Sequence, residues 1–198
     1  MTKRILILNS SPRKRGNVSQ MLDVIRTTLE AGGAEVETIR VNSLSVHPCI
    51  GCMQCRTVHR CALPEDDAQM VMEKVRSCQG IVVGAPCYWG NMPGTLKLLF
   101  DRMVYGLMDE SALGWPVGLH KGKPCVLVST STTPWPFNIL MHQSHGAVRA
   151  MKEVMGSSGF RIVGTIEKEG TKNNTSLSEK YERNCRKAAL RMLKKLSG

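Results

Sequence analysis

The sequence is short of aromatic residues, which make up 5% of the chain, and it contains no long apolar run. No stretch approaches the length of a membrane span. The apolar run that ends before Asn9 is far shorter than the hydrophobic core of a signal peptide. We therefore expect a cytoplasmic protein with no membrane partner, whose eight cysteines are reduced thiols or metal ligands and not a disulfide framework.

Several motifs of catalysis and nucleotide binding are also missing. The chain has neither G-x-G-x-x-G nor G-x-x-x-x-G-K-[ST], so neither a dinucleotide-binding Rossmann turn nor a Walker loop is indicated. It has no G-x-S-x-G nucleophile elbow, which leaves hydrolase chemistry without support. No Pro-, Gly- or Ser-rich stretch is long enough to act as a linker, so residues 1–198 are predicted to form a single domain.

Acidic residues are outnumbered, with 16 Asp and Glu against 27 Lys and Arg, which gives a net charge of +11. Such an excess indicates an anionic partner such as a nucleotide or a phosphate ester. Nucleic acid is not the expected partner, because basic and aromatic residues are not interleaved. Many of the cations lie between residues 183 and 195, where the apolar spacing indicates the solvated face of a C-terminal helix.

Five segments carry the signals of β-strands. The apolar runs at residues 5–8, 80–85, 125–128 and 162–166 are typical of strands buried on both faces of a parallel sheet, and residues 36–41 alternate as an edge strand does. Helical spacing separates these strands. The alternation predicts an α/β fold with a doubly wound, five-stranded parallel sheet and helices on both faces.

The helices have recognisable starts. Asn17 is predicted to cap the first helix, Asp66-Asp67 precede the second, and Pro93-Gly94 precede the third. A fourth is expected around residues 147–155, and the last begins at a Ser176-x-x-Glu179 capping box. Residues 41–64 and 108–121 show no clear period, so we expect them to be insertions that cover a site.

In such a sheet the ligand lies beyond the carboxyl ends of the strands, which directs attention to three loops. Residues 9–17 combine hydroxyls, cations and a helix start, as a phosphate site requires. Residues 86–93 contain Tyr88 and Trp89, on which a planar ring could stack. Residues 129–133 offer five successive hydroxyls. The three loops together favour a phosphomonoester that carries a planar ring.

Four motifs, in the order in which they occur along the chain, resemble those of a known family. Ser-Ser-Pro-Arg-x-x-Gly-Asn-x-Ser begins at Ser10, Asp66-Asp67 follow, Ala-Pro-x-Tyr-Trp-Gly ends at Gly90, and Gly-x-Leu-Lys-x-x-x-Asp-Arg begins at Gly94. Over about residues 1–130 the chain resembles the NADPH-dependent FMN reductase and iron–sulfur flavoprotein family. The resemblance implies a flavodoxin-like sheet of strand order 2-1-3-4-5, non-covalently bound FMN, and assembly as a homodimer or homotetramer.

The resemblance also implies a set of cofactor-binding residues. The FMN phosphate would be held by the first loop and the ring by the second, with Ser129 and its neighbours closing the site. The family commonly has Thr where this chain has Val18, whose backbone N–H still serves. The implied residues are Ser10, Arg13, Asn17, Val18 and Ser19 for the phosphate, and Pro86, Cys87, Tyr88, Trp89, Gly90 and Asn91 for the ring.

A compact group of cysteines, Cys49-x₂-Cys52-x₂-Cys55-x₅-Cys61, is the sharpest local feature. Its spacing lets four thiolates converge on one centre and approximates a bacterial ferredoxin run, with a longer last gap and no final proline. It agrees with the pattern of iron–sulfur flavoproteins, whose four cysteines bind [4Fe–4S]. Two alternatives stay open: a closed zinc site formed by the same thiolates, with His47 or His59 as further candidate ligands, and free thiols without metal.

The leading hypothesis is an FMN-dependent NAD(P)H oxidoreductase that takes electrons from a small-molecule donor and gives them to an unidentified acceptor. Hydride would pass from the nicotinamide to the flavin, and the protein would supply position and electrostatics. The alternative is a non-catalytic electron carrier of the flavodoxin type. Such carriers are typically acidic, so a net charge of +11 counts against it.

Overall fold

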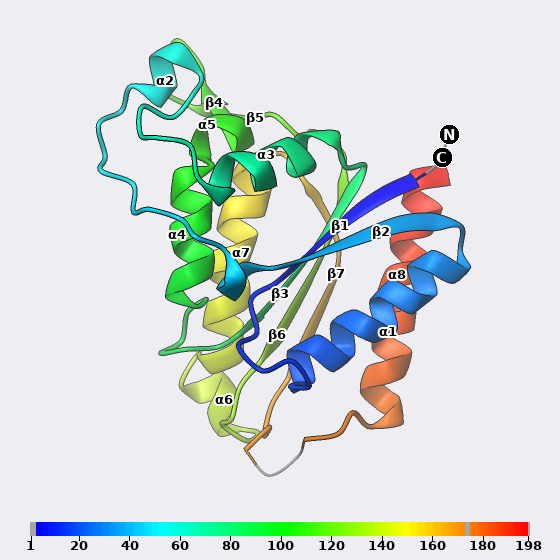
Figure 1. The fold of residues 1–198 in the computed structure, drawn as a ribbon. Helices are drawn as coiled ribbons and strands as arrows, with labels where there is room; N and C mark the ends of the chain where they lie inside the picture. The colour runs from blue at the N-terminus through cyan, green and yellow to red at the C-terminus, as the bar shows by residue number, and fades with distance from the viewer. Residues whose placement is uncertain (1–2, 173–174, 198) are drawn as a thin grey trace.

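A computed structural model describes residues 3–172 and 175–197 of the chain. Its centre is a parallel sheet of five strands in the order β2-β1-β3-β6-β7 (Figure 1). When only the five strands of this sheet are numbered along the chain, their order is the predicted 2-1-3-4-5. The strands are β1 (Lys3–Asn9), β2 (Ala34–Arg40), β3 (Gly80–Pro86), β6 (Pro124–Thr130) and β7 (Arg161–Lys168).

Helices cover both faces of the sheet (Figure 1). Ile5 and Ile7 of β1 face the core under α1 (Asn17–Ala31) and α8 (Glu179–Ser197). Leu6 and Leu8 face the opposite core, under α3 (Asp67–Ser77), α4 (Gly94–Arg102) and α7 (Gln143–Ser157). Because successive side chains of a strand point to opposite faces, an unbroken apolar run is what a strand between two helix layers needs. The predicted doubly wound α/β fold is confirmed.

The two segments without clear period form small elements. The first contains the 3₁₀ turn η1 (Val41–Ser43) and α2 (Cys55–Val58). The second follows α5 (Val104–Leu107) and forms the antiparallel pair β4 (Met108–Glu110) and β5 (Pro116–Gly118). Ion pairs from Arg56 to Glu110 and from His59 to Asp109 join the two segments. They therefore pack against each other beside Cys55. A further short helix, α6 (Phe137–Leu140), precedes α7.

Helix boundaries differ from the predictions in three places. Asn17 is the first residue of α1 and not its cap, because extended Gly16 takes the capping position and accepts the first helical hydrogen bond from Gln20 N. The last helix begins at Glu179, where the Ser178 carbonyl, not Ser176, accepts the first turn's N–H groups. The third predicted helix breaks at residue 103 into α4 and α5.

The start of α3 is as predicted. Asp66 Oδ1 accepts a hydrogen bond from Ala68 N at 2.9 Å, and Gln69 Oε1 accepts one from Asp66 N at 2.9 Å. This capping box satisfies two donors that a helix start otherwise leaves unpaired. Within the described residues, no helix is long and apolar enough to cross a membrane.

Candidate functional site

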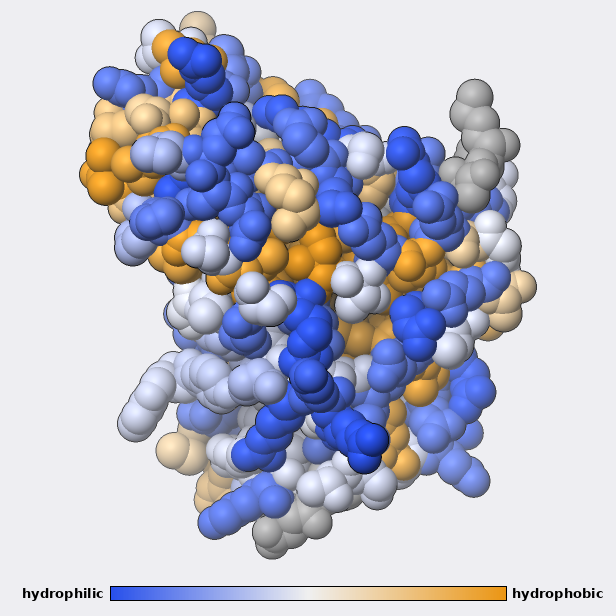
Figure 2. Space-filling model, viewed as in Figure 1, coloured by the Kyte–Doolittle hydropathy of each residue, from blue (hydrophilic) through white to orange (hydrophobic). Residues whose placement is uncertain are grey.

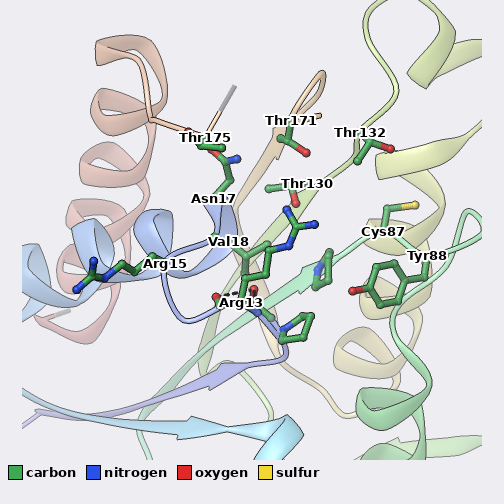
Figure 3. A pocket seen from close by; sticks show the side chains of 14 residues that line it. Arg13, Arg15, Asn17, Val18, Cys87, Tyr88, Thr130, Thr132, Thr171 and Thr175 are labelled. Atoms are coloured by element: carbon green, nitrogen blue, oxygen red, sulfur yellow. Dashed lines mark hydrogen bonds between the residues drawn. The ribbon is translucent and has the colours of Figure 1, made fainter. Parts of the chain in front are cut away.

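A cavity of about 320 Å³ lies at the carboxyl ends of β1, β3 and β6 (Figure 3). The three loops predicted to bind ligand meet there, joined by the segment that follows β7. The insertions at residues 41–64 and 108–121 do not line this cavity. The lining residues are Ser11, Pro12, Arg13, Arg15, Gly16, Asn17, Val18, Pro86, Cys87, Tyr88, Thr130, Thr132, Thr171 and Thr175.

The first loop ends at the N-terminus of α1 and presents positive charge to the cavity. Gly16 makes no side-chain cap, so the first turn leaves backbone N–H groups facing outward, as at helix N-termini that bind phosphate. Figure 3 shows the Arg13 side chain projecting into the middle of the cavity, whereas Arg15 points away from it. Neither arginine forms an ion pair with any residue that the structure describes. Arg13 is therefore available to an anion.

The neighbouring strand end holds this loop in shape. Arg40 Nη2 donates to the Ser11 carbonyl at 3.1 Å, and Asn42 Nδ2 donates to the Ser10 carbonyl at 2.9 Å. From inside the loop, Ser19 Oγ donates to the Arg13 carbonyl at 3.0 Å. These bonds fix the backbone before any ligand arrives, which reduces the entropy that binding must overcome.

Two hydroxyls beside the cavity are buried without a partner. Ser10 Oγ follows β1, Ser129 Oγ lies near the end of β6, and neither has a hydrogen bond within the described part of the chain. Buried polar atoms are normally paired, so an unpaired hydroxyl is a candidate for bonding to a ligand or an ordered water. The two residues were both predicted to contact the cofactor.

The second loop forms a tight turn that separates its two aromatic residues. Tyr88 and Asn91 exchange two backbone hydrogen bonds, at 2.9 and 3.0 Å. Trp89 and Gly90, between them, have positive φ values of 54° and 69°. A tryptophan in this conformation costs about 1–3 kcal/mol. The turn leaves Trp89 100% exposed, whereas Tyr88 lines the cavity with its hydroxyl toward the centre (Figure 3).

Helix α7 supports this turn from behind. A Cβ at Gly146 would lie 1.9 Å from the Gly90 carbonyl oxygen, so only glycine allows the two backbones to approach so closely. Cys87 Sγ points away from the cavity and lies 2.9 Å from the Gln143 carbonyl, to which the thiol donates (Figure 3). Burial raises the pKa of Cys87, so this thiol is held in its neutral form.

Half of the predicted cofactor residues line the cavity itself: Arg13, Asn17, Val18, Pro86, Cys87 and Tyr88. The remainder lie in the same loops without lining it: Ser10, Ser19, Trp89, Gly90, Asn91 and Ser129. Sequence reasoning missed Thr171 and Thr175, which follow β7. Thr171 Oγ1 donates to the Ser131 carbonyl at 3.0 Å, and Gln20 Nε2 donates to the Thr175 carbonyl at 2.6 Å. The polar run after the last strand was the signal that could have found them.

The cavity suits a phosphomonoester joined to a planar ring. One end has Arg13 and the open first turn of α1, which are donors that a phosphate dianion requires, and the unpaired Ser10 hydroxyl lies in the same loop. The other end has the apolar Pro86 ring and the Tyr88 aromatic face. These residues fit the predicted FMN, whose phosphate needs hydrogen-bond donors and positive charge and whose flat ring needs an apolar surface.

The four clustered cysteines line a second, smaller cavity of about 80 Å³. Cys49 and Cys52 are exposed, and Cys55 and Cys61 are half-buried. Burial raises the pKa of Cys55, and the negative charges of Cys49, Cys61 and Cys52 raise it further, so the four sulfurs interact electrostatically. A cation among them would reverse that penalty. Four thiols around one cavity are a donor set that soft metals and iron–sulfur clusters prefer.

Some features limit the metal hypotheses. Within residues 3–172 and 175–197, no three potential metal ligands are already gathered closely enough to hold an ion, so binding requires the exposed cysteines to turn inward. The zinc alternative that includes a histidine has no support. His47 Nδ1 lies 3.1 Å from Asp66 Oδ2, His59 faces Asp109, and neither histidine lines the cysteine cavity.

Comparison with known proteins agrees with these features. An iron–sulfur flavoprotein of Methanosarcina thermophila is 37% identical over 115 residues, which are 58% of this chain and 60% of that protein. The chain spans 44–60% of the length of three iron–sulfur flavoproteins that it matches.

Solved structures share the fold at low identity. An FMN-dependent NADH-azoreductase of Bacillus anthracis, in complex with FMN, has a TM-score of 0.72 at 15% identity, with both chains covered in full. A flavodoxin of Megasphaera elsdenii has a TM-score of 0.58 at 16% identity, covering 96% of this chain and 98% of the flavodoxin. These likenesses show a flavodoxin-like fold. A sequence model of the NADPH-dependent FMN reductases matches residues 3–165, and the chain therefore belongs to that family.

Proposed function

We propose that the protein is a single-domain, FMN-dependent NAD(P)H oxidoreductase that passes electrons through bound flavin to a second small molecule. The observation that carries the proposal is the cavity at the carboxyl ends of β1, β3 and β6, with a phosphate-binding end and an aromatic end. Family membership supports it independently. The net charge of +11 continues to count against the acidic electron-carrier alternative.

The phosphate end would be formed by Ser10, Arg13, Asn17, Val18 and Ser19. Arg13 supplies a guanidinium that no acidic residue neutralises within the described chain. The first-turn N–H groups of α1 add the positive end of the helix dipole. Ser19 acts from behind, because its hydroxyl already holds the Arg13 carbonyl. Together these groups anchor the ligand and fix its orientation.

The ring end would be formed by Pro86, Cys87, Tyr88 and the turn that follows. Backbone groups of Trp89, Gly90 and Asn91 would meet the ring edge, and Ser129 would close the site beneath it. Bound FMN supplies the isoalloxazine ring that accepts hydride from a nicotinamide and returns electrons to an acceptor. The chain's own task is positioning, which the paired turn and its glycine contact with α7 provide.

The proposal extends to a metal–thiolate centre held by Cys49, Cys52, Cys55 and Cys61, with [4Fe–4S] as the favoured occupant. Its support is that all four cysteines line one cavity, together with the names of the related proteins. Such a centre supplies a one-electron carrier. The cysteine segment would hold it close to the surface, where Ile50, Met53 and Val58 are exposed.

A second copy of the chain is the proposed partner of the apolar surface around α6. Large side chains there have more than half of their area exposed, and Trp89, which follows the cavity residue Tyr88, is also fully exposed. Exposed apolar clusters of this kind mark protein interfaces. A homodimer or homotetramer that buries this surface would place a neighbouring chain next to the ring end. The residues are Trp135, Phe137, Ile139, Leu140 and Met141.

The deciding experiment compares binding of FMN and of riboflavin, which lacks the phosphate, and then follows NAD(P)H oxidation. Arg13→Met should weaken FMN binding about 10- to 100-fold, the usual worth of a hydrogen bond to a charged group, and leave riboflavin binding unchanged. Lys14→Met, which removes a cation from the same loop at a residue that does not line the cavity, is the matched control. A wild-type protein that binds no FMN refutes the proposal, and one that binds FMN without oxidising NAD(P)H is an electron carrier.

A further inference from the structure

The cysteine segment, residues 48–63, is tied together at its two ends. Ser45 N donates to Asp67 Oδ2 at 2.6 Å, and Asp67 N donates to the Ser45 carbonyl at 3.2 Å. His47 N donates to Asp66 Oδ2 at 2.9 Å. The chain entering the segment thus lies against the chain leaving it, and all four clustered cysteines are in between. Figure 2 shows the apolar surface of this segment at the upper left.

A buried arginine from another element bonds to both ends. Arg102, the last residue of α4, has a side chain that is 0% exposed. Its Nη1 donates to the His47 carbonyl at 3.1 Å, and its Nη2 donates to the Pro64 carbonyl at 3.3 Å. One carbonyl precedes the first clustered cysteine and the other follows the last. A single guanidinium therefore sets the distance between the two ends of the segment.

The charge of this arginine is balanced by an equally buried carboxylate. Arg102 Nη1 lies 3.1 Å from Asp66 Oδ2, and the Asp66 side chain is 5% exposed. Burial raises the pKa of Asp66, but hydrogen bonds from His47 and Ala68 and the charge of Arg102 outweigh it and lower the pKa. The Asp66 carboxylate is thus ionised at neutral pH. A buried pair is a poor source of stability, because desolvation costs both partners, and its retention suits a positioning role.

The same arginine borders the cysteine cavity. Arg102 lines the 80 Å³ cavity with all four cysteines, and its Nε is buried without a hydrogen-bond partner among the residues described. The other charged groups there have partners of their own. Arg56 pairs with Glu110, and Asp101 pairs with Lys97. Arg102 therefore keeps one N–H donor free beside the cavity, and sulfur ligands of a metal are acceptors that such a donor can serve.

We propose that Arg102 is the positioning residue of the four-cysteine metal centre, holding both ends of the cysteine segment and donating its Nε–H to a sulfur of that centre. The inference rests on the proposed metal–thiolate centre. It concerns a buried arginine on α4, outside the cysteine motif. Asp66 serves it by balancing the charge.

The test uses the reduced full-length protein and Co²⁺ alone, whose thiolate complexes absorb in the near ultraviolet by sulfur-to-metal charge transfer and in the visible by d–d transitions. Arg102→Met should weaken Co²⁺ binding at least tenfold. Arg102→Lys keeps the positive charge beside Asp66 but loses the several N–H donors of the guanidinium. We therefore expect weaker Co²⁺ binding and, at saturation, a charge-transfer band at lower energy. A loss of packing alone would not move that band. Arg186→Met, an exposed arginine on α8, is the control and should match the wild type.

Flavin binding reports whether each variant is folded. If Arg102→Met loses FMN binding, a double variant replaces it in the test. The double variant carries Arg102→Met and Asp66→Asn, so that neither buried charge is left without its partner. Wild-type protein that binds Co²⁺ without four-thiolate absorption refutes the metal centre, and the inference with it. Wild-type protein with that absorption, but with all Arg102 variants within twofold in affinity and unchanged in band position, refutes the role of Arg102 alone.

Discussion

Gly146→Ala should damage the cofactor cavity from a position that does not line it. The added methyl would lie 1.9 Å from the Gly90 carbonyl oxygen and 2.8 Å from the carbonyl carbon. Ordinary contact begins near 3.4 Å, so backbone must withdraw by about 1.5 Å. Neither neighbour is a flexible side-chain end. The turn that carries Tyr88 must therefore move, or α7 must shift away from it.

The expected change in the free energy of unfolding is the balance of two effects. Alanine is about 1 kcal/mol better than glycine in a helix, whereas forcing atoms into a packed contact costs about 1–3 kcal/mol. Gly156→Ala is the matched control, since it lies in the same helix and its added methyl would meet nothing within 4 Å. Gly156→Ala should gain about 1 kcal/mol. Gly146→Ala should be less stable than Gly156→Ala by about 1–3 kcal/mol.

Urea unfolding measures the two stabilities, and fluorescence titration measures FMN affinity. The turn is part of the ring end, so Gly146→Ala should also weaken FMN binding about tenfold or more, while Gly156→Ala leaves it unchanged. If the two variants prove equally stable and bind FMN equally well, the contact between α7 and the turn does not shape the site.

Two further predictions concern titratable groups. Burial lowers the pKa of His120, so the unfolded chain takes up a proton before the folded chain as the pH falls below about 6.5, and the free energy of unfolding should fall with it. Urea unfolding between pH 5 and 7 should show that this free energy depends less steeply on pH in His120→Gln than in the wild type. An identical dependence in the two proteins would contradict the argument. Burial raises the pKa of Cys78 to about 11 and of Cys185 to about 12. Iodoacetamide at pH 8 should therefore label exposed Cys49 and Cys52 long before those two, as mass spectrometry would show, and early labelling of Cys78 would count against its burial.

The sequence by itself determined the fold and the location of the site. Unbroken apolar runs such as residues 5–8 specify strands covered on both faces, and the alternation with helices then leaves few topologies. The start of α3 was readable because Asp66 and Asp67 directly precede residues with helical spacing. The three site loops were readable because parallel strands end at one edge of the sheet.

Only the tertiary structure decided how side chains within those loops are used. Adjacent Tyr88 and Trp89 differ in exposure because a turn with positive φ at Trp89 and Gly90 reverses the chain between Tyr88 and Asn91. Thr171 joins the site through a bond to a loop 40 residues earlier. Arg102 ends one of the four family motifs, yet nothing in that motif indicates that its side chain is buried between segments distant along the chain. Local patterns encode local geometry, whereas these contacts arise when distant segments pack, and no local spacing records them.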